Sequence, residues 1–364
     1  MAHELIFLTG ATGVLGQDLV KELLETTKAD IAILARAKGR NSHADRAAKI
    51  LKGVGLDRHL GARIRVVEGD VTHHKFGVRK DDLDFLEREC EVFYHIAALT
   101  ALNGTEKECQ AINVGGTEHA LELAWDLRKK GRLKRFVYFS TAFVAGSVWK
   151  HCSKEDVLPQ SPVFANYYES SKYKAETKVR EAMAKGLPTT VIRPSIVVGH
   201  SETGEVSDFN VIYPFFKLFA HGAISKLPTR LENTFNIVPI DFVIKATCAI
   251  VSNPKSINRA FHLVAPHPPT IGMLLKLAKE EYPRVPPIEI IDPKEFRKSK
   301  LPPQEQMVFA IMEPYLGYLN GQLTFDVTNT REILRGTEIL LPKTDFAFLK
   351  TMIHYAVKAG YLVI

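Results

Sequence analysis

Short apolar runs alternate with helical patterns along the first two hundred residues of the chain. The runs are rich in Val, Ile, Phe and Tyr, and they predict six strands, at residues 5–9, 31–35, 63–68, 92–96, 136–140 and 190–193. Apolar residues at helical spacing predict four helices, at residues 14–27, 42–51, 106–129 and 166–185. Because the strands are almost continuously apolar, helices should cover both faces of their sheet. The pattern therefore predicts an α/β fold with a doubly wound parallel sheet.

The hydrophobic pattern changes after residue 200. Residues 201–208 are polar, residues 209–227 are rich in aromatics, and residues 235–240 and 260–264 predict further strands. Nine of the nineteen prolines lie within residues 266–303, and proline cannot donate to a strand ladder, so this segment predicts short helices and loops. We therefore expect a core at 1–200, a substrate-side insertion at 201–234, a return to the core sheet at 235–265, and a smaller C-terminal substrate-binding cap at 266–364.

Composition narrows the classes of function. The 364 residues include 48 Lys plus Arg against 41 Asp plus Glu, and 46% are apolar, so a globular protein is expected rather than a disordered one. No apolar run approaches the roughly 20 residues of a membrane span and no leader precedes the first strand, so a cytoplasmic location is expected. The four cysteines form no CxxC pair, so we expect neither disulfides nor a metal site. The densest basic run, residues 128–135, lacks aromatics and suits a solvated helix end, so no nucleic-acid partner is expected.

Residues 5–16 read LIFLTGATGVLG, a strand that runs directly into three glycines and then into a helix. In that context Gly10 permits a tight turn, Gly13 lets backbone amides approach a pyrophosphate, and Gly16 allows close helix packing. The partial positive charge at the helix N-terminus favours the same anion. The motif predicts a dinucleotide site that also includes Thr12, Val14 and Leu15.

The residue that ends the second strand distinguishes NADPH from NADH. A carboxylate there would accept from the ribose 2′-hydroxyl, whereas a guanidinium pairs with a 2′-phosphate. Here the residue is Arg36, and Arg46 lies one short helix further on, so NADPH is preferred to NADH, although an arginine after a strand can also be simply solvated. Asp70, after the third strand, could accept from an adenine amino group or cap a turn. Other residues at the carboxyl ends of the strands complete the predicted site: Val71, Ala97, Ala98, Leu99 and Ser140.

A YxxxK pattern places a phenol and an ammonium one helical turn apart, and the sequence contains two. Tyr168 and Lys172 open the helix after the fifth strand, where Thr141 lies at the carboxyl edge, so these three groups can meet a nicotinamide. The ammonium should lower the pKa of the phenol toward neutral pH. Tyr213 and Lys217 lie in the aromatic segment and are interpreted as packing or cap residues.

These motifs together resemble the extended short-chain dehydrogenase/reductase superfamily over roughly residues 5–265. The glycine turn TGATGVLG, YHIAALT, INVGGTEHALELA, STAFV, YESSK and VIRPSIVVG occur in the family's order. The resemblance implies a Rossmann-type core, a Tyr168 general acid, a Lys172 that positions ribose and a Thr141 that polarises the substrate carbonyl. It further implies that Asn113 lies near the active-site helix and that the backbone of Pro194, Ser195 and Ile196 lies beside the carboxamide.

Finer features are similar to the branch that contains fatty acyl-CoA reductases and carrier-protein thioester reductases. They are LARAKGRNSHADRAAKIL with its arginine pair, the polar loop GHSETGEVSDFN, the aromatic segment and FNIVPIDFV. This likeness implies NADPH-dependent reduction of an acyl thioester to an aldehyde and possibly an alcohol. It also implies a CoA or acyl carrier protein donor, and related enzymes suggest a homodimer through the helices around Glu106 and Asn166.

Two other functions remain open on the residues alone. The same core could act on a sterol, flavonoid or sugar-nucleotide carbonyl or alcohol, as an oxidoreductase or epimerase. The fold could also serve a non-catalytic NADP-binding regulator, although the intact Thr141, Tyr168 and Lys172 argue against this. For the substrate, Phe215, Phe216, Leu218 and Phe219 predict either the wall of an acyl site or burial against the cap.

Overall fold

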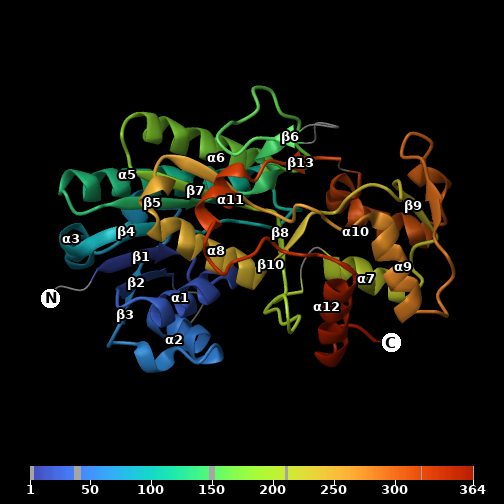
Figure 1. The fold of residues 1–364 in the computed structure, drawn as a ribbon, viewed down its shortest axis with the longest axis horizontal. Helices are drawn as coiled ribbons and strands as arrows, with labels where there is room; N and C mark the ends of the chain where they lie inside the picture. The colour runs from blue at the N-terminus through green and yellow to red at the C-terminus, as the bar shows by residue number, and fades with distance from the viewer. Residues whose placement is uncertain (1–3, 37–41, 147–151, 210–211, 321, 364) are drawn as a thin grey trace.

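A parallel sheet forms the centre of the computed structural model, which describes residues 4–36, 42–146, 152–209, 212–320 and 322–363 (Figure 1). Within these residues the sheet has seven strands in the order β11-β7-β5-β4-β1-β2-β3, all paired in parallel. The strands are β1 (Leu5–Thr9), β2 (Asp30–Ala35), β3 (Ile64–Glu68), β4 (Cys90–His95), β5 (Arg135–Phe139), β7 (Thr189–Pro194) and β11 (Arg259–Leu263). The order reverses direction between β1 and β4, where ligands of doubly wound sheets bind. The predicted fold class is confirmed.

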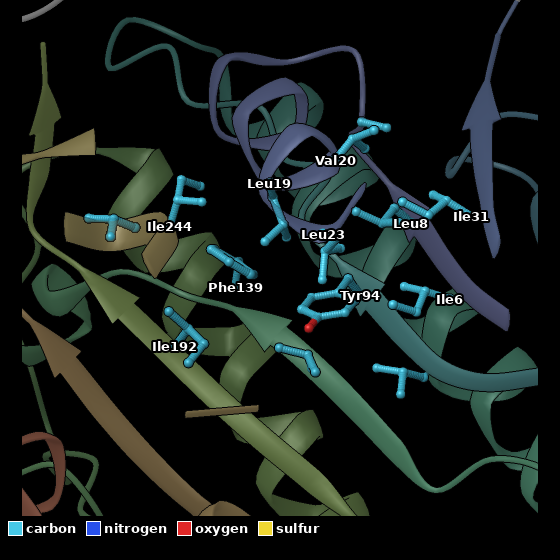
Figure 2. Close-up of a cluster of buried hydrophobic side chains, with 14 of the residues drawn as sticks. Ile6, Leu8, Leu19, Val20, Leu23, Ile31, Tyr94, Phe139, Ile192 and Ile244 are labelled. Carbon is cyan, nitrogen blue, oxygen red and sulfur yellow. The ribbon is translucent and has the colours of Figure 1, made fainter. Parts of the chain in front are cut away.

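Helices cover both faces of this sheet. One face packs against α1 (Val14–Thr26), α2 (His43–Gly53), α8 (Ile240–Ser252) and α11 (Thr328–Leu334). The other face packs against α3 (Lys80–Glu89), α5 (Gly116–Lys129) and α6 (Tyr167–Ala184). Figure 2 shows the first of these interfaces, where Leu19, Val20 and Leu23 of α1 lie over Leu8 and Tyr94 of the sheet.

The predicted helix at residues 106–129 has three parts in the structure. A short α4 (Glu106–Cys109) leads into a π-helical turn (Gln110–Gly115) and then into α5. Wide turns of this kind are frequent at functional sites, and this one carries Asn113. Helix α3 was not among the predicted helices, because seven of its ten residues are charged and its apolar stripe is narrow.

A second group of helices gathers at the end of the molecule away from the N-terminus (Figure 1). It contains α7 (Ile212–Ala220), α9 (Ile271–Glu281), α10 (Pro303–Leu319) and α12 (Phe346–Lys358), which share one hydrophobic cluster. Two short strands, β9 (Lys226–Pro228) and β12 (Glu289–Ile291), pair at its edge. Residues of the predicted insertion and cap thus pack together into a single layer. Among the described helices, none is long and apolar enough to cross a membrane.

Two segments differ from the predicted division of the chain. The predicted strand at residues 235–240 contains only β10 (Ile237–Pro239), which pairs with β8 (Ile196–Val198) and not with the main sheet. Residues of the predicted C-terminal cap return to the core, because β13 (Thr324–Phe325) pairs with β6 (Cys152–Ser153) and α11 packs beside β11. Ile333 and Leu334 of α11 belong to the core cluster, so hydrophobic burial brings this segment back to the sheet.

Candidate active site

The first strand ends in a glycine turn that leads directly into α1. Gly10 has a φ of +77°, and a Cβ there would lie 2.6 Å from the amide nitrogen of Ala97. A Cβ on Gly16 would overlap the carbonyl oxygen of Gly10, so both glycines are required by the packing of the turn. At Gly13, by contrast, the nearest atom is 3.4 Å away and the position faces a cleft. The protein itself does not crowd Gly13, so room beside it is left for a ligand.

Helix α1 begins at this turn without a cap of its own. Its N-cap residue is Gly13, no side chain accepts from its first amides, and its first turn contains no acidic residue. Free amides and the helix dipole at such an end favour an anion. The N-terminus of α1 is therefore suited to a phosphate.

The cleft has a volume of about 520 Å³ and lies at the carboxyl ends of the central strands. Every residue predicted for the cofactor site contributes to its wall: Gly10, Thr12, Gly13, Val14, Leu15, Gly16, Arg36, Arg46, Asp70, Val71, Ala97, Ala98, Leu99, Ser140, Tyr168, Lys172, Pro194, Ser195 and Ile196. Thr141 lines it as well. Residues that are far apart in the sequence thus meet because parallel strands end at the same edge.

Two arginines converge at the end of the cleft beyond β2. The Nη1 atom of Arg46 donates to the backbone carbonyl oxygen of Arg36 at 3.3 Å, and both residues line the cleft. Arg36 also forms an ion pair with Asp70 at 3.4 Å, and its side chain remains about half exposed. Burial raises the pKa of Asp70, but hydrogen bonds from Thr72 and the charge of Arg36 outweigh it and lower the pKa overall. Asp70 therefore caps a turn and orients Arg36, in addition to lining the cleft.

Tyr168 and Lys172 face the cleft from the first turns of α6. The Thr141 hydroxyl, at the end of β5, hydrogen-bonds with the Tyr168 phenol. Lys172 is buried, its Nζ donates to the carbonyl oxygen of Phe139 at 2.6 Å, and it lies 4.4 Å from the ring centroid of Tyr138. The predicted Thr141, Tyr168 and Lys172 are therefore brought together at one point of the cleft.

The expected lowering of the Tyr168 pKa by Lys172 is not seen. Burial raises the pKa of Tyr168 to about 12, although the hydrogen bond with Thr141 opposes this shift. Burial also lowers the pKa of Lys172 to about 7. The interpretation failed because it considered only the attraction between the two groups, whereas removal from water disfavours the charged form of each. Tyr168 is thus a protonated phenol at neutral pH, able to donate a hydrogen bond.

Asn113 does not line the cleft and instead holds its walls together. Its carboxamide oxygen accepts from the Leu99 amide at 2.7 Å, and its nitrogen donates to the Leu99 carbonyl oxygen and the Ser171 hydroxyl. Leu99 belongs to the loop after β4, and Ser171 lies on α6. The π-helical turn therefore makes Asn113 a positioning residue.

Two buried hydroxyls on the wall of the cleft, those of Ser140 and Ser195, lack a hydrogen-bond partner among the described residues. The hydroxyl of Ser195 is buried and, among the residues that the structure describes, nothing hydrogen-bonds to it. Burying a hydroxyl in this way costs free energy unless a ligand or water satisfies it. Ser195 lies after β7 on the wall of the cleft, which fits a polar ligand group at that place.

The second YxxxK pattern lies outside the cleft. The Tyr213 side chain is buried, and its hydroxyl accepts from the Gly199 amide at 3.3 Å. Lys217 lies 4.7 Å from the ring centroid of Tyr361 near the C-terminus. These contacts support the interpretation of Tyr213 and Lys217 as packing residues.

The aromatic segment does not form the wall of the cleft. Phe216 and Phe219 are 1% and 3% exposed and lie in the hydrophobic cluster of α7, α9, α10 and α12. Phe215 and Leu218 line a separate cavity of about 40 Å³. Of the two interpretations, burial against the cap is therefore the correct one. When a helix is apolar around most of its circumference, neighbouring helices can bury its surface as readily as a ligand can.

Other residues line the reactive end of the cleft, and the sequence pattern did not single them out. They are chiefly apolar and come from four separate segments: Leu102, Phe143, Val206, Asp208 and Tyr318. Phe143 could have been selected because it lies two residues after Thr141. Tyr318, near the end of α10, carried no sequence signal because it lies 150 residues beyond Tyr168.

The depressed pKa of Lys172 predicts how stability depends on pH without cofactor. Between about pH 7 and the ordinary lysine value of 10.5, the unfolded chain binds a proton that the folded chain does not, so this residue makes stability rise with pH. The comparison is the difference in free energy of unfolding between the wild type and Lys172→Met. We expect this difference, wild type minus variant, to rise by about 1 kcal/mol per pH unit from pH 7 to 9.5. Urea unfolding at several pH values measures this difference, and a flat difference would contradict a buried neutral amine.

A search of family models matches residues 8–247 to a NAD-binding family described as male sterility protein. Among curated proteins, the chain is 32% identical over 265 residues to a component of the linear gramicidin synthase of Brevibacillus parabrevis, covering 71% of this chain and 5% of that protein. It is 27% identical over 282 residues to a putative fatty acyl-CoA reductase of Drosophila melanogaster, covering 68% of this chain and 51% of that protein. The chain thus spans about half or less of the length of these two relatives.

A solved structure shares the whole architecture. The crystal structure of the terminal R domain from the myxalamid PKS-NRPS biosynthetic pathway superposes with a TM-score of 0.84 and 28% sequence identity. The superposition covers 100% of this chain and 92% of that domain. The similarity therefore includes the C-terminal helices as well as the sheet.

Proposed function

This chain belongs to the male sterility protein family of NAD(P)-binding oxidoreductases, within the extended short-chain dehydrogenase/reductases, and we propose that it reduces acyl thioesters with NADPH. The observation that carries the proposal is one cleft with a phosphate-binding turn at one end and Tyr168 with Thr141 at the other. Residues from the ends of β1, β2, β4, β5 and β7 line the cleft between these two ends.

The residues present fit a dinucleotide. The uncapped N-terminus of α1 would hold the pyrophosphate, and Arg36 with Arg46 would hold a 2′-phosphate. The unpartnered Ser195 hydroxyl and the backbone after β7 would meet the nicotinamide end. When bound, the reduced cofactor supplies the hydride that reduces the carbonyl carbon.

The side chains at the reactive end would handle the oxygen and the proton. The Tyr168 phenol and the Thr141 hydroxyl can both donate to the substrate carbonyl oxygen, which stabilises the negative charge that develops there. Tyr168, protonated at neutral pH, then gives its proton to that oxygen. Lys172, when protonated, provides positive charge beside the phenol, and Asn113 keeps Ser171 and the catalytic helix in place. Overall, a thioester, one hydride and one proton yield an aldehyde and a free thiol.

The choice of an acyl thioester rests on the relatives and on the apolar lining. The curated relatives include a protein named as a putative fatty acyl-CoA reductase, and the similar structure is a terminal R domain. Leu102, Phe143, Val206 and Tyr318 supply an apolar part of the cleft wall, which suits an acyl group better than a sugar diphosphate. Coenzyme A or an acyl carrier protein would deliver the acyl group.

A substrate panel tests this function. The purified chain is incubated with NADPH and acyl-CoA, acyl-pantetheine, sugar-nucleotide and steroid ketone substrates, and both NADPH oxidation and products are measured. We expect aldehyde or alcohol from the thioesters. Turnover of a sugar nucleotide or steroid ketone, with no aldehyde or alcohol from any thioester, would refute the proposal.

Arg36 should set the cofactor preference. Charge-assisted hydrogen bonds contribute about 1.5–3 kcal/mol each, so NADPH should bind at least about tenfold more tightly than NADH. We expect Arg36→Ala to lose most of this preference in a fluorescence titration. Arg58→Ala, which removes an exposed arginine outside the cleft, serves as the control. Equal affinities in the wild type would overturn the assignment.

A further inference from the structure

A second cavity lies behind the reactive end of the cleft. It has a volume of about 140 Å³, and Phe143, Ile196 and Tyr318 line both it and the cleft. The rings of Phe143 and Tyr318 meet edge to face, with centroids 4.8 Å apart. These two rings therefore lie where the cleft and the second cavity adjoin.

A buried carboxyl group faces this second cavity. Glu169 follows Tyr168 directly in α6, lines the cavity and is 3% exposed. One of its oxygens accepts from the Ala165 amide at 2.9 Å, and the Tyr318 hydroxyl donates to the carboxyl group. Burial raises the pKa of Glu169, and no described residue forms an ion pair with it, so an ionised carboxyl group there would lack a protein counter-charge.

The cavity offers acceptors and no cation. Asn320 also lines it, and its carboxamide oxygen is buried without a hydrogen-bond partner among the described residues. Of the described lining residues, none is lysine, arginine or histidine. A buried carboxylate and a free amide oxygen are costly unless a donor meets them, and an ammonium group supplies three N–H donors and the missing charge.

The structural role of Glu169 does not require a carboxylate. Its bonds to the Ala165 amide and the Tyr318 hydroxyl tie the start of α6 to α10, and both partners are donors. A glutamine could accept both bonds through its single carbonyl oxygen, which has two lone pairs. A glutamine would keep these bonds but could not ionise, so only the glutamate can pair with a cationic ligand in the cavity.

We propose that the second cavity receives the acyl chain of the substrate, and that Glu169 with Asn320 selects short chains that carry an amino group. This inference rests on the proposed thioester reductase function. The chain is short because the cavity has a volume of only about 140 Å³ and because Phe143, Ile196 and Tyr318 line both the cavity and the cleft. An amine a few bonds from the thioester carbonyl would then reach the carboxylate while the carbonyl stays at Tyr168.

Two pantetheine thioesters of equal length test this selectivity in the full chain with saturating NADPH. In 3-aminopropanoyl-pantetheine a nitrogen replaces the terminal carbon of butanoyl-pantetheine. We expect the wild type to favour the amino chain by at least about tenfold in kcat/KM, mainly through KM, because hydrogen bonds to charged groups are the stronger kind. Glu169→Gln should reduce this ratio about tenfold, again through KM.

Further variants separate selectivity from folding. Glu181→Gln removes an exposed carboxylate from the same helix and should leave the ratio unchanged. Asn320→Asp adds a second carboxylate to the cavity and should raise the ratio, which tests the inference even if Glu169→Gln fails to fold. Circular dichroism checks each fold.

The possible outcomes distinguish a failure of the proposed selectivity from a failure of the proposed thioester reductase function. Equal kcat/KM for the two thioesters in the wild type, or an unchanged ratio in folded Glu169→Gln, would overturn the selectivity and leave the reductase function standing. If neither thioester, nor any other in the substrate panel, were reduced, the reductase function would fail and this inference with it.

Discussion

Tyr168→Phe should lower turnover by two or more orders of magnitude while leaving cofactor binding nearly intact. The change removes the hydroxyl that donates to the substrate oxygen, and general-acid contributions are about 10² to 10⁴ in rate. The ring itself remains, so the wall of the cleft keeps its shape. Steady-state kinetics with a thioester that the wild type reduces measure turnover, and an NADPH titration measures cofactor binding.

Tyr213→Phe is the matched control for this experiment. It removes the hydroxyl of the other YxxxK pattern, whose contact is the Gly199 amide and which lies outside the cleft. We expect turnover within a few-fold of the wild type. Near-normal rates in Tyr168→Phe combined with inactivity in Tyr213→Phe would show that the wrong tyrosine has been assigned.

Phe216→Asp should prevent stable folding and should not act on substrate affinity. The Phe216 side chain is 1% exposed within the cluster of α7, α9, α10 and α12. Truncating a buried phenylalanine costs about 3–5 kcal/mol, and an unpaired buried carboxylate adds to that loss. The sum is comparable to the whole stability of a typical domain, which is about 5–15 kcal/mol. Circular dichroism and the yield of folded protein measure the result.

Phe216→Leu provides the comparison for the aspartate variant. It keeps an apolar side chain at the site, so it should fold and lose far less stability than Phe216→Asp. A Phe216→Asp protein that folds normally but binds long acyl chains weakly would instead restore α7 as a wall of the substrate site.

The glycine turn and the catalytic helix could be predicted from the sequence because both are local structures. A strand, a turn with three glycines and a helix follow one another within residues 5–26, and Gly10 and Gly16 are required by close contacts with Ala97 and within the turn. Tyr168 and Lys172 lie one helical turn apart wherever the helix is placed. The parallel sheet then follows from its continuously apolar strands, and it brings Arg36 and Thr141 to the edge where these local motifs end.

The pKa values of Tyr168 and Lys172 depend on burial, and burial is set by the tertiary structure and not by the local sequence. The sequence places an ammonium beside a phenol, but it does not say that both are removed from water. In the folded chain, desolvation raises the pKa of Tyr168 and lowers that of Lys172. Asn113 likewise became a positioning residue only when the π-helical turn aimed it at Leu99 and Ser171.

The substrate end of the site was decided by tertiary packing. Phe216 and Tyr318 both belong to the hydrophobic cluster of the C-terminal helices, but only Tyr318 also lines the cleft. Periodicity marks a face as apolar but does not specify whether a helix or a ligand covers it. Contacts across 150 residues, such as that between Tyr318 and Glu169, form only when α10 packs against the start of α6. The motifs of an NAD(P)-binding oxidoreductase were therefore readable from the sequence, whereas the shape and lining of the cavities beside them came from the fold.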